Sequence, residues 1–281
     1  MNEPVLVQWH DSIAIVTMNR PASRNALSRS MAHAMTEAIA SSQHAAAIVI
    51  TGADPAFCAG MDLIEAAEQG YIDTDWIQRT FLDSKVPLLA AVNGAAVTAG
   101  LEIALACDFI LASDRASFAD THGLVGAVSG GGITVRLAER TSSGFARQMS
   151  YTGTFINAET AVRSGLANQV FRHEDLLPEA LAIAQSMTRI APESLRMIKR
   201  MYDEVGLLAP KAGLHHERTL FTEFTSSSQA DFAGYHARIR RSSAAKDDEL
   251  TIDPDVLGLV DAYVEKTTEP KDDEVEVEPL E

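Results

Sequence analysis

Several features that mark other protein classes are scarce or missing in this 281-residue sequence. Only two cysteines, Cys58 and Cys107, are present. They are too few for a disulfide framework, so we expect a reducing, cytoplasmic setting. The longest apolar run, residues 101–112, is interrupted by Glu102 and Asp108 and is too short to span a bilayer. The N-terminus lacks the basic and apolar stretches of a signal peptide, and we predict no membrane insertion.

Positive charge is also scarce, since the formal net charge is −16. Most of the excess is local: residues 246–281 hold fourteen Asp or Glu against three Lys, a net of −11, which leaves −5 for residues 1–245. No basic stripe with interleaved aromatic residues occurs, so we expect no nucleic-acid partner. We interpret residues 246–281 as a flexible acidic tail, either a solubilising end or an interaction arm.

What is present is an ordinary globular composition, 46 % apolar and 22 % charged, enough for one large domain or two small ones. Short β-rich runs alternate with helical stretches through residues 5–140, and Ser28 is a candidate N-cap for one of the helices. Strands that alternate with helices predict an α/β fold with parallel pairing. From residue 178 to about 243 apolar residues recur at helical spacing, which indicates a helical region used for association.

Four segments in series carry a family resemblance. They are IVTMNRPASRNALS (15–28), IVITGADPAFCAGMDL (48–63), NGAAVTAGLEIALACDFILAS (93–113) and the stretch 117–171 that begins SFADTH. Together, over about residues 5–245, they resemble the enoyl-CoA hydratase/isomerase (crotonase) superfamily. The resemblance implies a spiral of repeated ββα units over residues 1–177, a C-terminal helical region over 178–245, and a homotrimer or dimer of trimers.

Two loops that run into predicted helices suggest how a thioester would be held. AFCAGMDL and TAGLE each place small residues directly before a helix, where backbone N–H groups lack intrahelical partners. Two such donors that converge on one point form an oxyanion hole. The resemblance assigns the donors to Met61 and to Ala99, with Gly100 beside it. The family often has glycine where Ala99 stands, and a methyl group is tolerated there if the local φ is negative.

Glu102 is the candidate catalytic residue. It stands in the apolar run 101–107, and a carboxylate in such a place is costly unless it is paired or functional. It matches one of the two glutamates that hold water and share acid and base duties in hydratases of the family. A first-turn glutamate is also favoured by the helix dipole, which is the structural alternative.

The second glutamate of the family is absent, and His122 stands at its position, four residues after Phe118. In an extended stretch Phe118, Asp120 and His122 share one face, so Asp120 could orient the imidazole. A histidine transfers protons near neutral pH, and an Asp–His pair could replace the lost carboxylate. Alternatively, His122 only lines the pocket or faces solvent.

For CoA, the resemblance points to the loop Arg24, Asn25, Ala26 and Leu27, with Ala59 beside the pantetheine. Arg24 suits a phosphate. Basic residues of the helical region could reach a phosphate too, or be solvated: Lys199, Arg238 and Arg240. No GxGxxG opens the first βα unit, and Cys58 has no evident base. We expect no metal and no cofactor beyond the CoA of the substrate.

The pattern leads to one reading with two alternatives. The first is a 2-enoyl-CoA hydratase that works through an oxyanion-stabilised thioester enolate, with Glu102 as general acid/base. The missing second glutamate leaves open an enoyl-CoA isomerase or an acyl-CoA-binding relative without turnover. The sequence does not identify the acyl group.

Overall fold

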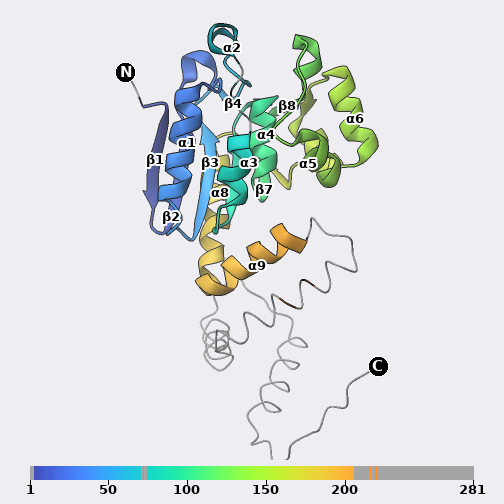
Figure 1. Cartoon of the computed structure of the whole chain (residues 1–281). Helices are drawn as coiled ribbons and strands as arrows, with labels where there is room; N and C mark the ends of the chain where they lie inside the picture. The colour runs from blue at the N-terminus through green and yellow to red at the C-terminus, as the bar shows by residue number, and fades with distance from the viewer. Residues whose placement is uncertain (1–2, 71, 73–74, 206–215, 217–218, 220–281) are drawn as a thin grey trace, which may run out of the picture. The chain divides into compact units, whose positions relative to one another are not determined.

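The computed structural model describes residues 3–70, 72, 75–205, 216 and 219, so the predicted tail and most of the predicted association region lie outside the described residues. A six-stranded sheet forms the centre of the unit Met1–His215 (Figure 1). Its order is β1 (Val5–His10), β2 (Ile13–Met18), β3 (Ala47–Gly52), β5 (Leu88–Val92), β7 (Phe109–Ser113) and β10 (Gln169–Phe171). β1 and β2 form an antiparallel hairpin, and the strands from β2 onward pair in parallel.

A second sheet repeats the path of the first with shorter strands. It contains β4 (Ala56–Cys58), β6 (Ala95–Val97), β8 (Ser117–Ala119) and β9 (Ile156–Asn157). β3, β5 and β7 of the large sheet are each followed by β4, β6 and β8 of the small one, and then by a helical segment. This is the spiral of ββα units that the sequence predicted, and the fold prediction is confirmed.

The helices cover both faces of the large sheet. They are α1 (Arg29–Ser41), α2 (Leu63–Gln69), α3 (Asp75–Leu82), α4 (Ala99–Ala106), α5 (Ile133–Arg140), α6 (Ser143–Thr152), α7 (Ala158–Ser164), α8 (Leu176–Ser186) and α9 (Pro192–Val205). Short 3-10 turns are η1 (Pro21–Ser23), η2 (His122–Val125) and η3 (Met187–Arg189). None of the helices in the described part of the chain is long and apolar enough to cross a membrane.

Alternate side chains of the central strands supply two apolar clusters. Ile48 and Ile50 of β3 pack with α1 and α4, whereas Ala47 and Val49 pack with α8. A strand buried on both faces must be apolar throughout, which explains the unbroken AIVIT run. Because α8 belongs to this core and begins at Leu176, the predicted boundary between residues 177 and 178 falls inside a helix.

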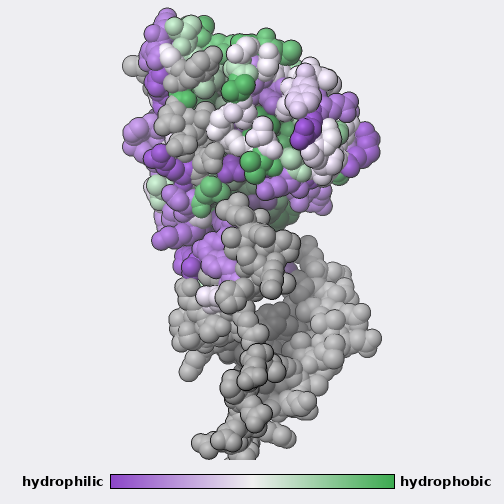
Figure 2. Space-filling model, turned by 45° about the vertical axis from the view of Figure 1, so that its right-hand side comes forward, coloured by the Kyte–Doolittle hydropathy of each residue, from purple (hydrophilic) through white to green (hydrophobic). Residues whose placement is uncertain are grey.

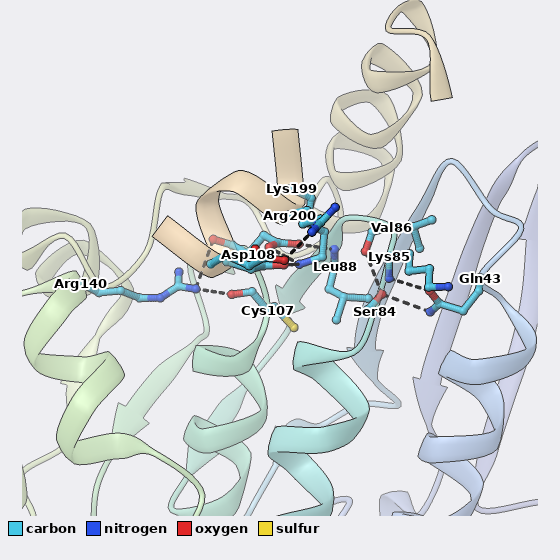
Figure 3. Close-up of polar contacts among 12 residues, drawn as sticks. Gln43, Ser84, Lys85, Val86, Leu88, Cys107, Asp108, Arg140, Lys199 and Arg200 are labelled. Carbon is cyan, nitrogen blue, oxygen red and sulfur yellow. Dashed lines mark hydrogen bonds and ion pairs between the residues drawn. The ribbon is translucent and has the colours of Figure 1, made fainter. Parts of the chain in front are cut away.

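An ion-pair network fastens α9 to the core (Figure 3). Lys199, 8 % exposed, donates to Asp108 Oδ1 at 2.8 Å and lies 3.0 Å from Asp203 Oδ2. Asp108 Oδ2 also accepts from the Leu88 N–H at 2.7 Å, and Arg140 donates to the Cys107 carbonyl. The expectation that Lys199 could reach a CoA phosphate is therefore wrong, because its ammonium group is already paired. Arg238 and Arg240 lie outside the described residues.

Local capping explains where two of the helices begin. The Ser28 hydroxyl accepts from the Met31 N–H and caps α1, as predicted. The Asp62 carboxylate does the same for α2 by accepting from the Glu65 N–H, so this helix begins at Leu63. Arg20 donates to Asp62 at 2.9 Å and thereby ties η1 to the start of α2.

Candidate active site

Two loops of the small sheet bring the predicted oxyanion donors to one end of the sheet. β4 and β6 are parallel, so the loops that lead to α2 and α4 leave from the same edge. Leu27 bridges to Met61: its N–H donates to Gly60 O at 2.7 Å and its carbonyl accepts from Asp62 N at 2.9 Å. In such a parallel bridge the flanking residues make the hydrogen bonds, so the Met61 N–H points away from Leu27.

Ala99 is the first residue of α4, where a backbone N–H has no intrahelical partner. Its φ is not among the positive values of the described non-glycine residues, so the condition for an alanine at this position is met. A Cβ on Gly100 would lie 2.1 Å from the Cys58 carbonyl oxygen, so this glycine lets the two loops pack closely, and its part in the oxyanion hole stays a prediction.

Met61 and Ala99 line the same cavity, whose volume is about 260 Å³. Its polar side is formed by Thr98, Glu102, Thr121 and His122, and its apolar side by Leu63, Ile72, Val125 and Val128. Several of these apolar residues are exposed at its rim, including Leu63, Val125 and Val128. Figure 2 shows hydrophobic residues among hydrophilic ones near the upper end of the molecule, the end at which α2 lies in Figure 1. The cavity suits a ligand with an apolar chain and one polar group.

Glu102 points into this cavity from the first turn of α4 and is 1 % exposed. Its Oε1 accepts from the Ser129 hydroxyl at 2.7 Å and from the Gly131 N–H at 2.8 Å. Its Oε2 is buried and has no hydrogen-bond partner among the described residues. Buried polar atoms are nearly always paired, so an unpartnered carboxylate oxygen on a cavity-lining residue marks Glu102 as a candidate functional group.

Ser129 and Gly131 are site residues that sequence reasoning missed. A run of three glycines, residues 130–132, stands directly before α5. Its second glycine touches the carboxylate so closely that a Cβ there would lie 2.5 Å from Glu102 Oε2. Glycine often stands where the backbone approaches another group closely, so the glycine run was the signal in the sequence that could have pointed to this contact.

Asp120 and His122 form the pair that the sequence proposed, but by another route. Strand β8 ends at Ala119 and His122 begins η2, so the extended stretch in which the two would share a face with Phe118 does not exist. Phe118 lies in the core, and a turn brings His122 Nδ1 to 2.7 Å from Asp120 Oδ1. Because a carboxylate can only accept, Nδ1 carries the hydrogen and Nε2 is left for the cavity that His122 lines.

The contact between Asp120 and His122 changes the pKa of both side chains. Burial raises the pKa of Asp120, but hydrogen bonds from His122 and Ser150 outweigh burial and leave the pKa below its usual 3.8. Burial lowers the pKa of His122, yet the hydrogen bond to Asp120 and the charge of Glu102 together raise it above 6.5. The imidazole is therefore held in its charged form to a higher pH than a free histidine.

The predicted CoA residues divide into two groups. Asn25 and Leu27 are fully buried, and the Asn25 amide donates to the carbonyls of Ala53 and Ala56 at 2.7 Å each. Their side chains support the loop from within, and the assignment of this loop to CoA stays a prediction. Arg24 is exposed, and its carbonyl accepts from the Ala59 N–H at 3.0 Å. Arg24 and the half-buried Ala26 therefore border Ala59, which lines the cavity.

Cys58 lies beside the oxyanion loop but is fully buried. Burial raises the pKa of its thiol to about 11. A thiol with that pKa is almost entirely protonated near neutral pH and is a poor nucleophile, so the residue serves packing, as the sequence suggested.

A ββα spiral with backbone N–H groups in the two loops that lead to α2 and α4, a buried glutamate and an apolar cavity defines the crotonase class of acyl-thioester proteins. The comparisons agree, because the enoyl-CoA hydratase/isomerase family matches residues 8–242. The chain is 32 % identical to a probable enoyl-CoA hydratase of Mycobacterium leprae, over 82 % of this chain and 93 % of that protein. It is 35 % identical to the 2,3-dehydroadipyl-CoA hydratase of Escherichia coli, over 78 % and 89 %.

Solved structures give the same result. An enoyl-CoA hydratase from Mycobacterium tuberculosis is 38 % identical, with a TM-score of 0.69 over 78 % of this chain and 99 % of that chain. An enoyl-CoA hydratase from Bacillus anthracis is 26 % identical, with a TM-score of 0.78 over 85 % and 96 %. The chain belongs to the enoyl-CoA hydratase/isomerase family.

Proposed function

We propose that the protein is an enzyme that adds water across the double bond of a 2-enoyl-CoA. The observation that carries the proposal is the buried Glu102, whose Oε2 has no hydrogen-bond partner among the described residues, in the lining of a cavity that Met61 and Ala99 also line. The curated relatives named as enoyl-CoA hydratases support the same reaction.

The Met61 and Ala99 N–H groups would hold the thioester oxygen. As the water oxygen bonds to C3, the electrons of the C2=C3 double bond move toward that oxygen, and two fixed donors stabilise the resulting enolate. In other enzymes the loss of one such donor lowers kcat by about 10²–10³-fold.

Glu102 and His122 divide the proton transfers. Glu102 Oε2 accepts a proton from the attacking water, while Ser129 and Gly131 fix the other carboxylate oxygen. The imidazolium of His122 donates its Nε2 proton to C2, and Asp120 holds Nδ1 throughout. Water contributes OH to C3, and a proton reaches C2. Transfer of the Glu102 proton back to His122 through a cavity water restores the starting state.

The test is the loss of the enoyl-thioester ultraviolet absorbance with a series of straight-chain 2-enoyl-CoAs. Glu102→Gln keeps the shape of the side chain and should lower kcat by about 10²–10⁴-fold, the usual contribution of a general acid/base. Glu139→Gln, an exposed glutamate on α5, is the matched control and should retain full activity.

Two other outcomes would replace this proposal. Absorbance that appears from a 3-enoyl-CoA, without loss from a 2-enoyl-CoA, would indicate an isomerase. Tight acyl-CoA binding with no turnover on any chain length would indicate the binding relative that the missing second glutamate allows.

We also propose a homotrimer or dimer of trimers that acts in the cytoplasm on acyl-CoA in fatty-acid metabolism. Family resemblance supports the assembly, and the two buried free thiols fit a reducing setting. Sedimentation of the full chain tests the assembly: a monomer at micromolar concentration would contradict it. Removal of residues 246–281 before the same measurement tests whether the acidic tail takes part.

A further inference from the structure

Thr98 has a backbone conformation that threonine rarely adopts. Its φ is 47° and its ψ is −110°. The other described non-glycine residues with positive φ are Asp11, Arg24 and Asn25, and none of them is β-branched. A β-branched residue at positive φ is strained by its own side chain, whereas glycine is not. Such strain persists where the surrounding structure imposes it and often marks functional positions.

Helix capping does not account for a threonine here. Thr98 is the N-cap residue of α4, a position at which threonine commonly accepts a hydrogen bond from the first turn. Its side chain makes no capping hydrogen bond. The backbone of Thr98 is held instead: its N–H donates to Ala119 O at 3.0 Å, and its carbonyl accepts from Glu102 N at 2.9 Å. Any residue could make these backbone bonds, so the hydroxyl is not needed for them.

The Thr98 hydroxyl lies against Gly60, in the loop that carries Met61. Thr98 lines the cavity with Met61, Ala99 and Glu102. A Cβ on Gly60 would lie 2.2 Å from Thr98 Oγ1, so this oxygen packs directly against Gly60. Gly60 precedes Met61, and Thr98 precedes Ala99. The hydroxyl is thus next to both peptides whose N–H groups would bind the thioester oxygen.

We propose that the Thr98 hydroxyl donates a third hydrogen bond to the thioester oxygen, in addition to the Met61 and Ala99 N–H groups. The proposal rests on the proposed function. A second observation supports a polar ligand in this place: Glu102 lines the same cavity, and its buried Oε2 has no hydrogen-bond partner among the described residues. The strained backbone fixes the hydroxyl beside Gly60 before substrate arrives, and donors fixed in advance are the effective ones at a developing oxyanion.

The kinetic test compares Thr98→Val with Thr98→Ser. Valine keeps the shape and the strain but removes the hydroxyl, whereas serine keeps the hydroxyl. With a 2-enoyl-CoA, Thr98→Val should lower kcat by about tenfold or more, and Thr98→Ser should stay within about threefold of wild type. Equal rates for wild type and Thr98→Val would overturn the proposal. So would equal losses in both variants.

A spectroscopic test needs no turnover. A hydrogen bond to the thioester carbonyl of a bound 2,4-dienoyl-CoA polarises the conjugated system and shifts its absorbance to longer wavelength. Wild type and Thr98→Ser should give the same shift, and Thr98→Val a smaller one. If wild type shows no hydration, the proposed function fails, and this shift alone decides the role of Thr98. Equal shifts in all three proteins, or no binding of the probe, would overturn it.

Thr98→Gly separates the hydroxyl from the strain. Glycine relieves the positive φ, so the Tm should rise by roughly 3 °C. The absorbance shift should nevertheless fall to the Thr98→Val level. A Thr98→Gly protein with the full wild-type shift would contradict the proposal.

Discussion

Two hydrogen-bonded Asp–His pairs occupy different settings in this molecule. His122 lines the cavity with Glu102, and Asp120 lies behind it; the Asp120 and His122 side chains are 6 % and 17 % exposed. His173 Nε2 lies 3.0 Å from Asp54 Oδ2, in a loop between β3 and β4, and the Asp54 side chain is 63 % exposed. His173 Nδ1 also lies 3.1 Å from the Ser113 hydroxyl. The second pair therefore extends into a Ser–His–Asp series.

Residue types alone would favour the second group as a catalytic triad. The burial of its members is the reverse of that in a catalytic triad, because Ser113 is fully buried while Asp54 faces solvent. A nucleophile must reach its substrate, whereas the orienting acid is normally the buried member. The first pair has the opposite arrangement, with a buried Asp120 and an imidazole at a cavity. Access to a cavity therefore distinguishes a reactive Asp–His pair from a structural one better than the types of side chain do.

The largest expected difference between the pairs is in activity. His122→Gln should lower kcat by about 10²–10⁴-fold, because it removes the proton donor to C2. His173→Gln is the matched control and should leave kcat within about twofold. Steady-state hydration assays of both variants measure this. A larger loss in His173→Gln than in His122→Gln would reverse our interpretation of the pairs.

The second expected difference is in stability and its dependence on pH. Asp120→Asn should lower the free energy of unfolding by about 1–3 kcal/mol, the usual cost when a buried hydrogen-bonded charge loses its partner. Because the pKa of His122 is raised in the folded protein, its contribution to the free energy of unfolding is fully present below pH 6.5. The contribution is lost as the pH rises through the pKa of the folded state. Because the pKa of Asp120 is lowered in the folded protein, its contribution to the free energy of unfolding is present above pH 3.8. That contribution is lost as the pH falls through the pKa of the folded state.

The deficit of Asp120→Asn should therefore be greatest between about pH 4 and 6.5 and should shrink above that range. Urea unfolding at a series of pH values measures it. A deficit that grows steadily from pH 6 to 9 would contradict the assigned direction of the shifts.

A third difference concerns the charge that surrounds His122. Asp120→Asn and Glu102→Gln should each lower the pKa of His122, the first more than the second, because the hydrogen bond outranks the more distant charge. Asp54→Asn should leave the pKa of His122 unchanged. Titration of the imidazole resonances by NMR follows all three variants. An unchanged His122 pKa in Asp120→Asn would mean that the pair does not form in solution.

The smallest effect is expected at the surface pair. Burial raises the pKa of Asp54, but hydrogen bonds from Asn93 and His173 outweigh burial and lower it. Because the carboxylate is largely exposed, Asp54→Asn should cost under about 1 kcal/mol of unfolding free energy. Thermal or urea unfolding at pH 7 measures this, and a loss above that of Asp120→Asn would show that exposure is a poor guide here.

The sequence alone determined much of this protein, because the relevant signals are local. The β–α alternation predicted the parallel sheet, Ser28 marked the start of α1, and an isolated carboxylate in an apolar run marked Glu102. Such features depend on neighbours within a few residues, and these are readable in order along the chain.

Only the tertiary structure decided what each of these residues contacts. Ser129 and Gly131 hold Glu102 from 27 and 29 residues away, and Lys199 meets Asp108 across 91. The Asn25 side chain supports its loop by donating to the Ala56 carbonyl, 31 residues away. The local periodicity of a sequence does not specify such contacts, because the path of the whole chain sets them. The conformation of Thr98 is also set by the path of the whole chain, because two packed loops hold this β-branched residue at a positive φ that it rarely adopts.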